Sequence, residues 1–294
     1  MILKTIEYQE NIDLRNFCTI KVGGKGKIVY FPKDHKEISI LIKEYDNIYP
    51  LGIGSNLIFS DGIVNKVFVH SKNLKKYEIE NQNDIFYITA EAGVSFKTIV
   101  SVVKKYNLEG FENLSGIPAT VGGATAMNAG AYGSDIFDLI EEVWWIDREG
   151  RLNHSKKEEI KYSYRYSQFQ NGGFVYKVKL KLRKSDKNIS EIIKNHLLDR
   201  NSKQPLDLPT AGSTYKNPPG TYAGKLIEAV GLKGYRINDI GFSEKHANFL
   251  VNYGNAEFKD LIKLLELAEK KVLDEFKINL EREVKIIDHH HHHH

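Results

Sequence analysis

Residues Leu51–Asp61 read LGIGSNLIFSD, which places two glycines, a hydroxyl and an amide at the end of a short apolar segment. Backbone N–H groups of such a loop can surround a phosphate. The dinucleotide fingerprint G-x-G-x-x-G would need a third glycine at position 57, where Leu57 stands. The segment therefore predicts a phosphate-binding loop and disfavours a Rossmann fold.

A second loop, Gly116–Gly133, reads GIPATVGGATAMNAGAYG and holds more glycines than one turn requires. Its composition predicts backbone wrapped against a flat or anionic ligand, and the alternative is a buried irregular loop. Two such loops in one chain favour a nucleotide cofactor. The run Gly220–Lys225 is no phosphoryl-transfer loop, because Leu226 stands where serine or threonine would hold magnesium.

The composition predicts a soluble protein of two or three domains. The chain has 294 residues, 41% of them apolar, and a net charge of +4. Residues 289–294 are all histidine and are interpreted as an expression tag. The single cysteine, Cys18, cannot form an internal disulfide, no segment is apolar enough to span a membrane, and Met1–Glu10 lacks the apolar core of a signal peptide. We expect a cytosolic protein that binds anionic small molecules rather than nucleic acid or membranes, and no metal site.

Strand-like and helix-like segments alternate, which predicts an α/β or α+β fold. We expect strands at 27–31, 67–70, 85–91 and 174–182, the last of them half-solvated. We expect helices at 35–45, 95–106, from Ser190 toward Arg200, and at 257–276, where Leu261, Leu264, Leu265, Ala268, Val272 and Phe276 form one apolar face. The polar stretch 183–188 predicts a domain boundary.

The stretch Pro209–Pro218, PTAGSTYKNP, predicts a tight turn that presents Ser213 beside Lys216 and Asn217. A hydroxyl in this setting is a candidate proton donor. On its own the stretch is more typical of an ordinary turn.

Several motifs, in order from about residue 19 to residue 287, together resemble the MurB family of UDP-N-acetylenolpyruvoylglucosamine reductases. They are Lys21–Gly24, Gly52–Asn56, Gly116–Pro118, Asn128–Gly133, Tyr164–Ser167, Ala211–Ser213, Ala223–Glu228, Gly231–Gly234, Ser243–Asn252 and Leu280–Val284. Arg282 departs from the family pattern, which commonly has proline there.

The resemblance implies an α+β protein with an FAD-binding fold of the vanillyl-alcohol-oxidase type. Residues 1–75 and 76–188 would form the two FAD-binding subdomains, and 189–288 the substrate domain. Since neither glycine-rich loop contains histidine, we expect noncovalent FAD, with NADPH as the hydride donor, in a monomer. The cofactor-binding residues implied are Gly52, Gly54, Ser55, Asn56, Leu57, Gly116, Ile117, Pro118, Thr120, Gly122, Gly123, Asn128, Gly130, Ala131 and Tyr132.

The family reaction reduces the enolpyruvyl ether of UDP-N-acetylglucosamine enolpyruvate. The resemblance implies that Arg165 polarises the substrate carboxylate, that Glu283 binds the developing enolic acid, and that Ser213 protonates the carbon. Alone, Arg165 would be interpreted as a surface ion pair, and alternation does not distinguish Glu281 from Glu283. The implied substrate-binding residues are Tyr164, Lys203, Asn217, Lys225 and Glu228, although Lys225 is also typical of a helix start. The short run 218–222 resembles the family branch that lacks a longer insertion.

Two other functions remain open from the residues alone. One is a flavin-dependent oxidase of the same broad fold, and the other is a noncatalytic protein that binds flavin or a UDP-sugar. The C-terminal motifs disfavour the first, and the presence of Arg165, Ser213 and Glu283 together disfavours the second.

Overall fold

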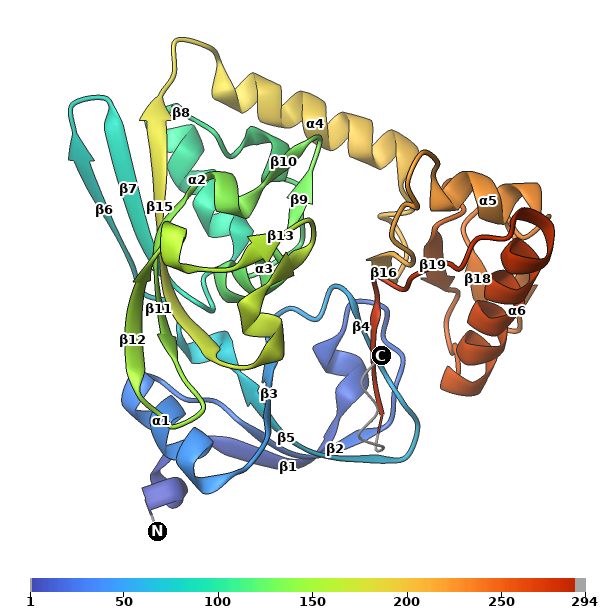
Figure 1. Cartoon of the computed structure of the whole chain (residues 1–294), viewed down its shortest axis with the longest axis horizontal. Helices are drawn as coiled ribbons and strands as arrows, with labels where there is room; N and C mark the ends of the chain where they lie inside the picture. Colours follow the sequence, from blue (N-terminus) through green and yellow to red (C-terminus); the bar gives the residue numbers. More distant parts are fainter. Residues whose placement is uncertain (1, 289–294) are drawn as a thin grey trace. The chain divides into compact units, whose positions relative to one another are not determined.

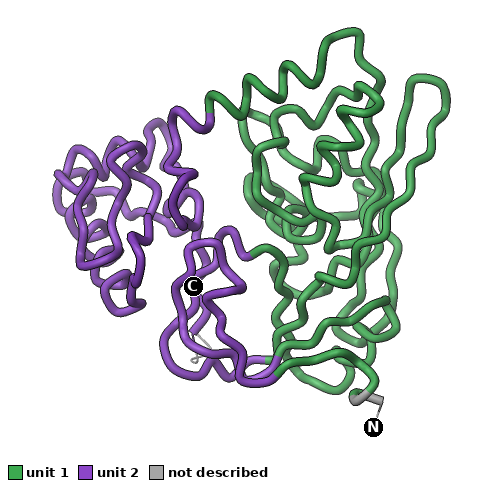
Figure 2. The backbone as a smooth tube through the Cα atoms, turned by 180° about the vertical axis from the view of Figure 1, so that it is seen from behind, with its two compact units in different colours: residues 1–9, 29–53, 67–199 green, residues 10–28, 54–66, 200–294 purple. Residues whose placement is uncertain are grey.

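The computed structural model describes residues 2–288, so the tag predicted at 289–294 lies outside the described residues. The chain divides into two compact units, each assembled from segments that are distant in the sequence (Figure 2). Unit 1 comprises 1–9, 29–53 and 67–199, and unit 2 comprises 10–28, 54–66 and 200–294. The final division falls inside helix α4 (Ile189–Lys203) rather than at 183–188. The three-domain scheme stays a prediction.

Unit 1 contains a large antiparallel sheet (Figure 1). The strand order is β12-β11-β15-β7-β6, and β8 also pairs with β15. The strands are β6 (Tyr77–Gln82), β7 (Ile85–Glu91), β8 (Leu108–Glu109), β11 (Ile140–Ile146), β12 (Leu152–Lys156) and β15 (Phe174–Lys184). Val178, Leu180 and Leu182 of β15 are buried while Lys181 is exposed, so the predicted half-solvated strand is confirmed.

Two helices cover the buried face of this sheet: α2 (Phe96–Tyr106) and α3 (Val121–Met127). The predicted helix at 95–106 is confirmed, and Ser95 caps it by accepting a hydrogen bond from the N–H of Thr98. Its apolar face packs with the interior side chains of β7 and β15. Each large apolar side chain buried in this way contributes about 1.5–3 kcal/mol.

Smaller elements complete unit 1. Strand β3 (Ile48–Leu51) pairs in parallel with the second half of β5 (Ile63–His70), and α1 (His35–Glu44) precedes β3. The short hairpins are β9 (Gly130–Ala131) with β10 (Ser134–Asp135), and β13 (Tyr162–Ser163) with β14 (Tyr166–Ser167). A four-stranded sheet has the order β1-β2-β5-β3, where β1 is Tyr8–Asp13 and β2 is Lys25–Tyr30, and β1, β2 and β5 each contain residues of both units. The 3-10 helices of unit 1 are η1 (Ile2–Thr5), η3 (Ser71–Asn73), η4 (Glu112–Leu114), η5 (Ile136–Asp138), η6 (Lys157–Glu159) and η7 (Gln168–Asn171), and η2 (Leu14–Phe17) belongs to unit 2.

Unit 2 has a smaller antiparallel sheet of order β16-β19-β18-β17. Its strands are β16 (Thr210–Ser213), β17 (Arg236–Ile237), β18 (Ile240–Phe242) and β19 (Phe249–Asn252), and its helices are α5 (Ala223–Ala229) and α6 (Phe258–Phe276). The predicted apolar face of α6 is buried from Leu261 to Val272. The prediction is wrong at Phe276, which is 38% exposed, because the buried stripe ends a turn earlier.

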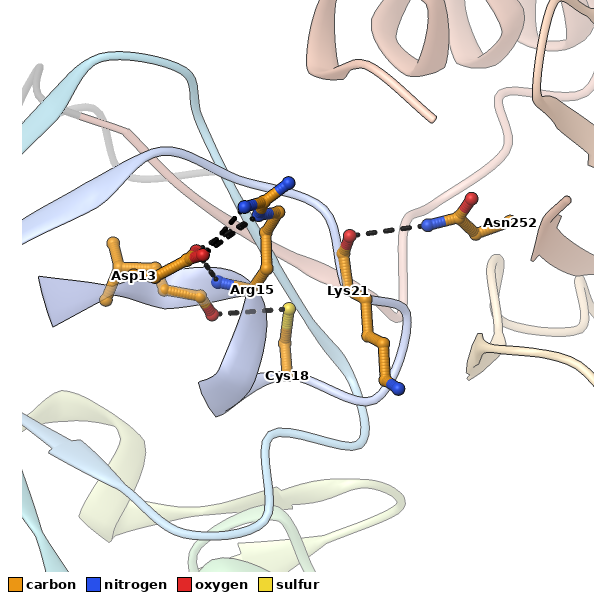
Figure 3. A network of polar contacts seen from close by, with 6 residues as sticks. Asp13, Arg15, Cys18, Lys21 and Asn252 are labelled. Carbon is orange, nitrogen blue, oxygen red and sulfur yellow. Dashed lines mark hydrogen bonds and ion pairs between the residues drawn. The ribbon is translucent and has the colours of Figure 1, made fainter. Parts of the chain in front are cut away.

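The C-terminal segment of unit 2 runs beside β16 and then forms β20 (Lys285–Ile287), which pairs in parallel with β4 (Leu57–Phe59). Asn252 also joins distant segments, because its side-chain amide donates to the carbonyl of Ile20 at 2.9 Å and to that of Lys21 at 3.3 Å. Figure 3 shows the contact with Lys21. These contacts fix the Lys21–Gly24 motif and the β4 loop to the C-terminal part of the chain.

Candidate active site

Gly52 and Thr120 lie against each other in unit 1. A Cβ atom at Gly52 would lie 2.7 Å from Oγ1 of Thr120, which is too close for a carbon. The same oxygen accepts a 3.2 Å hydrogen bond from the N–H of Gly123 and caps α3. A Cβ at Gly122 would lie 2.6 Å from the Cβ of Ala92. Packing alone therefore favours glycine at 52 and 122, and their contact with a cofactor stays a prediction.

The remainder of the first glycine loop belongs to unit 2. Gly54 has a φ of +73°, and a Cβ there would overlap the carbonyl oxygen of Phe17. The N–H of Thr19 donates to the Gly54 carbonyl at 3.0 Å, and the N–H of Lys285 donates to the Asn56 carbonyl at 2.9 Å. The loop is thus held on one side by the N-terminal segment and on the other by the C-terminal strand.

Arg165 occupies the second position of the two-residue turn between β13 and β14, with a φ of +51°. Its Nη2 atom donates to the Gly130 carbonyl at 2.9 Å, and its guanidinium carbon lies 4.6 Å from the centroid of the Tyr164 ring. A Cβ at Gly130 would lie 2.7 Å from Nη1 of Arg165. A Cβ there would also overlap the backbone carbonyl oxygen of Ser134, so the β9–β10 hairpin itself favours glycine at 130.

Asn128 is fully buried and holds this turn beside α3. Its Nδ2 donates to the Ser163 carbonyl at 2.8 Å and to Oδ2 of Asp135 at 3.1 Å, and its Oδ1 accepts from the N–H of Phe137 at 3.3 Å. The side chain is thus engaged with protein groups, and it positions the hairpin that carries Arg165. Its contact with a cofactor stays a prediction.

The other predicted cofactor residues flank these elements. Tyr132 has a φ of +52°; its hydroxyl donates to Oδ2 of Asp199 at 2.8 Å, and its ring lies 4.6 Å from that of His196 on α4. Gly116, Ile117 and Pro118 lie in the loop before α3, Ala131 in β9, Ser55 in the first glycine loop, and Leu57 at the start of β4.

Ser213 is the last residue of β16, so the tight turn predicted around it is wrong. Gly212 has a φ of +71°, and the pairing of β16 with β19 is irregular between Thr210 and Ser213. A glycine in the left-handed region lets a strand bulge without a turn. The carbonyl of Thr214 then accepts from the N–H of Glu283 at 2.8 Å. The structure thus brings the backbone of Ser213 and Glu283 together within unit 2.

Glu281 and Glu283 differ in their surroundings. The side chain of Glu281 is 72% exposed and pairs with Nζ of Lys216 at 3.2 Å, while Glu283 is half-buried. The choice of Glu283, which alternation left open, fits this difference. Arg165 belongs to unit 1, and Ser213 and Glu283 to unit 2, so the assembly of all three in one site stays a prediction.

Comparisons with known proteins identify the family. Residues 26–155 match the profile of the FAD binding domain, and 204–287 match the C-terminal domain of UDP-N-acetylenolpyruvoylglucosamine reductase. The enzyme of that name from Aquifex aeolicus is 44% identical over 285 residues, covering 96% of this chain and 95% of the relative. The one from Fusobacterium nucleatum is 38% identical over 280 residues, covering 94% and 98%. The chain belongs to the MurB family.

A solved structure agrees with this assignment. The crystal structure of UDP-N-acetylenolpyruvylglucosamine reductase (MurB) from Thermus caldophilus matches with a TM-score of 0.81 and 31% identity, covering 96% of this chain and 98% of that chain. The predicted fold class, an FAD-binding domain of the vanillyl-alcohol-oxidase type followed by the MurB C-terminal domain, is confirmed. No helix within residues 2–288 is long and apolar enough to cross a membrane, and those residues contain no cluster of three or more potential metal ligands.

The residues predicted to bind the MurB substrate lie on several elements. Oδ1 of Asn217 accepts from the N–H of Ala223 at 3.0 Å and so holds the start of α5. Nζ of Lys225 lies 5.0 Å from the centroid of the Tyr222 ring. Glu228 forms a 3.4 Å surface pair with Lys233. Lys203 ends α4, and Tyr164 stacks on Arg165.

Lys285 is a candidate that the MurB motifs did not identify. Its N–H is bonded to the first glycine loop, while its ammonium has no hydrogen-bond or ion-pair partner within residues 2–288. Burial lowers the pKa of Lys285, and the positive charge of Lys216 lowers it further. A half-buried cation without a counter-charge fits an anionic group of a bound cofactor. The sequence signal was a lysine directly after the Leu280–Val284 motif.

Proposed function

We propose that this chain reduces UDP-N-acetylglucosamine enolpyruvate to UDP-N-acetylmuramate in peptidoglycan precursor synthesis, with Ser213 as the proton donor. Membership of the MurB family supports the substrate and the reaction. The observation that supports the residue roles is the hydrogen bond from the N–H of Glu283 to the carbonyl of Thr214, because it holds the backbone of Glu283 against the residue that follows Ser213.

When bound, noncovalent FAD would supply the hydride for the substrate, after NADPH had reduced the flavin. The FAD binding domain match supports this cofactor. In unit 2, the backbone of Gly54, Ser55 and Asn56 and the unpaired ammonium of Lys285 are suited to an anionic group. In unit 1, the loop around α3 would contribute the remaining contacts. Since neither loop contains histidine, a covalent link through a histidine of these loops is excluded.

The side chains divide the rest of the chemistry between them. Hydride addition to an enolpyruvyl group builds negative charge on the carboxylate side, so the transition state needs a cation and a proton source. Arg165 supplies a permanently charged, planar fork for the carboxylate. Glu283 hydrogen-bonds the developing enolic acid and holds Arg165 and the substrate in register. Ser213 delivers its proton to the carbon that bears the carboxylate.

Binding of the UDP-sugar falls to Tyr164, Lys203, Asn217, Lys225 and Glu228. A lysine ammonium and an asparagine amide provide affinity for phosphate oxygens without taking part in proton transfer. We also propose that the short run 218–222 places this chain in the family branch without the longer insertion, and that it acts as a cytoplasmic monomer. Light scattering of the purified protein tests the last point.

The experiment that tests the reaction follows flavin absorbance under anaerobic conditions with Ser213→Ala and Ser213→Cys. NADPH should bleach the flavin of both variants at the wild-type rate, because that half-reaction needs no proton from Ser213. Reoxidation by the enolpyruvyl substrate should slow about 10²–10⁴-fold in Ser213→Ala, the usual contribution of a positioned acid. Ser213→Cys keeps a transferable proton and should lose less.

Two results would reject the proposal. Wild-type protein that is bleached by NADPH but not reoxidised by the sugar nucleotide is a flavoenzyme with another substrate. A Ser213→Ala variant that reoxidises at the normal rate removes this hydroxyl from proton transfer. FAD-loaded protein that does not react with NADPH would instead favour an oxidase or a binding protein.

A further inference from the structure

Glu269 of α6 accepts hydrogen bonds from two segments, one that follows Ser213 and one that precedes Glu283. Arg282 binds it with two donors, since Nε lies 2.8 Å from Oε2 and Nη2 lies 3.1 Å from Oε1. The hydroxyl of Tyr215 lies 2.7 Å from the same Oε2 and 3.1 Å from the Leu265 carbonyl. Two-donor arginine–carboxylate pairs fix orientation as well as distance. Glu269 therefore restrains two side chains that come from different segments.

These two side chains sit next to the residues assigned to the chemistry. Tyr215 follows Ser213 by two residues, and Arg282 immediately precedes Glu283. Tyr215 and Arg282 face each other in a β-bridge, and the Thr214 carbonyl accepts from the N–H of Glu283. The segment after Ser213 and the segment before Glu283 are thus joined twice, by backbone hydrogen bonds and by side-chain hydrogen bonds to Glu269.

The cluster is more shielded from solvent than the ion pair beside it. Tyr215 is 1% exposed, and the side chains of Arg282 and Glu269 are 26% and 29% exposed. The neighbouring pair Lys216–Glu281 joins the same two segments at the solvent side, where Glu281 is 72% exposed. Exposed pairs of this kind restrain little. The same two segments are therefore joined by the largely shielded Arg282–Glu269–Tyr215 cluster and by the exposed Lys216–Glu281 pair.

We propose that Arg282, Glu269 and Tyr215 form a positioning cluster that sets the placement of Glu283 relative to Ser213 during reduction of the substrate. The proposal rests on the function proposed above and adds three residues that do not touch the substrate. The cluster holds the two backbones at a fixed separation, and a displacement of about 1 Å at a reacting group can slow a reaction 10²-fold.

The test measures the two half-reactions separately in Glu269→Gln, Tyr215→Phe and Arg282→Lys, with Glu281→Gln as the control. Bleaching by NADPH and the affinity for FAD should stay within about twofold of wild type, since neither needs the Ser213–Glu283 separation. Reoxidation by the enolpyruvyl substrate should slow about 10- to 100-fold in Glu269→Gln at saturating substrate, with KM changed less than kcat. Arg282→Lys keeps the positive charge but loses the two-donor geometry of the guanidinium. Its reoxidation rate should therefore lie between those of wild type and Glu269→Gln. Glu281→Gln should match wild type.

Each other outcome overturns the proposal. A parallel loss of FAD affinity, bleaching and reoxidation would mean that the cluster only stabilises the fold, and an unchanged reoxidation rate would mean that it positions nothing. If Glu269→Gln does not fold, the same test is made with Tyr215→Phe, which removes a single oxygen atom. Its rates of bleaching by NADPH and of reoxidation by the substrate are then compared with those of wild type. Failure of the proposed function gives a different result, because wild-type protein itself would then not reoxidise with the sugar nucleotide.

Discussion

Gly54 and Gly62 form a matched pair that tests how the first glycine loop is held. Both residues have a φ of +73° and both belong to unit 2. A Cβ at Gly62 would meet nothing within 4 Å, while a Cβ at Gly54 would overlap the Phe17 carbonyl oxygen and lie 2.9 Å from the Cα of Cys18. Alanine at either position therefore carries the same backbone strain, but only Gly54→Ala adds a steric clash.

The expected magnitudes follow from these two situations. An L-residue in the left-handed region costs about 1–2 kcal/mol, so Gly62→Ala should lower the free energy of unfolding by that amount. Gly54→Ala adds an overlap with backbone atoms that no side-chain rotation can relieve, and overpacking of this kind costs a further ~1–3 kcal/mol or more. The difference between the two variants should be about 2 kcal/mol or more, which isolates the clash.

Urea unfolding of the apo protein measures this difference, and the slope should be equal in both variants if the transition remains cooperative. Fluorescence quenching of FAD measures the second effect. Relief of the clash at Gly54 displaces the loop that carries Asn56, so the affinity for FAD should fall more than tenfold, while Gly62→Ala should stay within about twofold. Equal stability losses in the two variants would refute the packing argument, and equal FAD affinities would refute the cofactor role of the loop.

Three further outcomes are expected. Arg165→Gly relieves the backbone strain that Arg165→Ala keeps, so it should be about 1 kcal/mol more stable than Arg165→Ala in urea, although both should lose reoxidation by the substrate; equal stabilities would contradict the strain. Lys285→Met should stabilise the apo protein by removing an uncompensated buried charge yet weaken FAD binding at least about tenfold, whereas Lys285→Arg should bind FAD more tightly than Lys285→Met; unchanged FAD binding would exclude Lys285 from the cofactor site. Burial, together with the positive charge of Lys72, lowers the pKa of His70 to about 4. Between about pH 6.5 and pH 4 this histidine is therefore protonated in the unfolded chain but neutral in the folded protein. The free energy of unfolding should fall by up to about 3 kcal/mol as the pH is lowered across that window. His70→Asn keeps a side-chain acceptor for the N–H of Lys72 without titrating and should flatten this dependence in unfolding titrations; an unchanged slope would assign it to other groups.

The elements that the sequence predicted best are those whose signals are local. Ser95 followed by an apolar stripe defines α2, and the alternation around Val178 defines β15, because capping and periodicity depend only on neighbouring residues. The glycine-rich loops and the MurB motifs were also local signals. Together they were sufficient for the fold class and for the family.

The contacts that assemble unit 2 could not be predicted in this way. Strand β20 pairs with β4, and Asn252 binds the Lys21 carbonyl, over separations of more than two hundred residues. The strands concerned are only three residues long, so no periodicity marks them. The tight turn predicted around Ser213 is instead a bulge at Gly212, and this difference also depends on a distant contact. Glycine adopts the left-handed conformation in turns and in bulges alike, so only the pairing of β16 with β19 distinguishes the two.

Backbone strain gives an independent argument for the role of Arg165. Among the described residues other than glycine, positive φ angles occur at five asparagines, two lysines, Tyr132 and Arg165. Asparagine adopts this conformation at low cost, but a tyrosine or an arginine does not. Such a conformation persists only where the surroundings enforce it, as they do here: Arg165 donates to the Gly130 carbonyl, and its own carbonyl accepts from Gln170 at 3.2 Å. A two-residue turn commonly requires a positive φ at its second position, so the turn itself accounts for the conformation of Arg165. The strain therefore supports a guanidinium held in a fixed place, and the catalytic role of Arg165 stays a proposal.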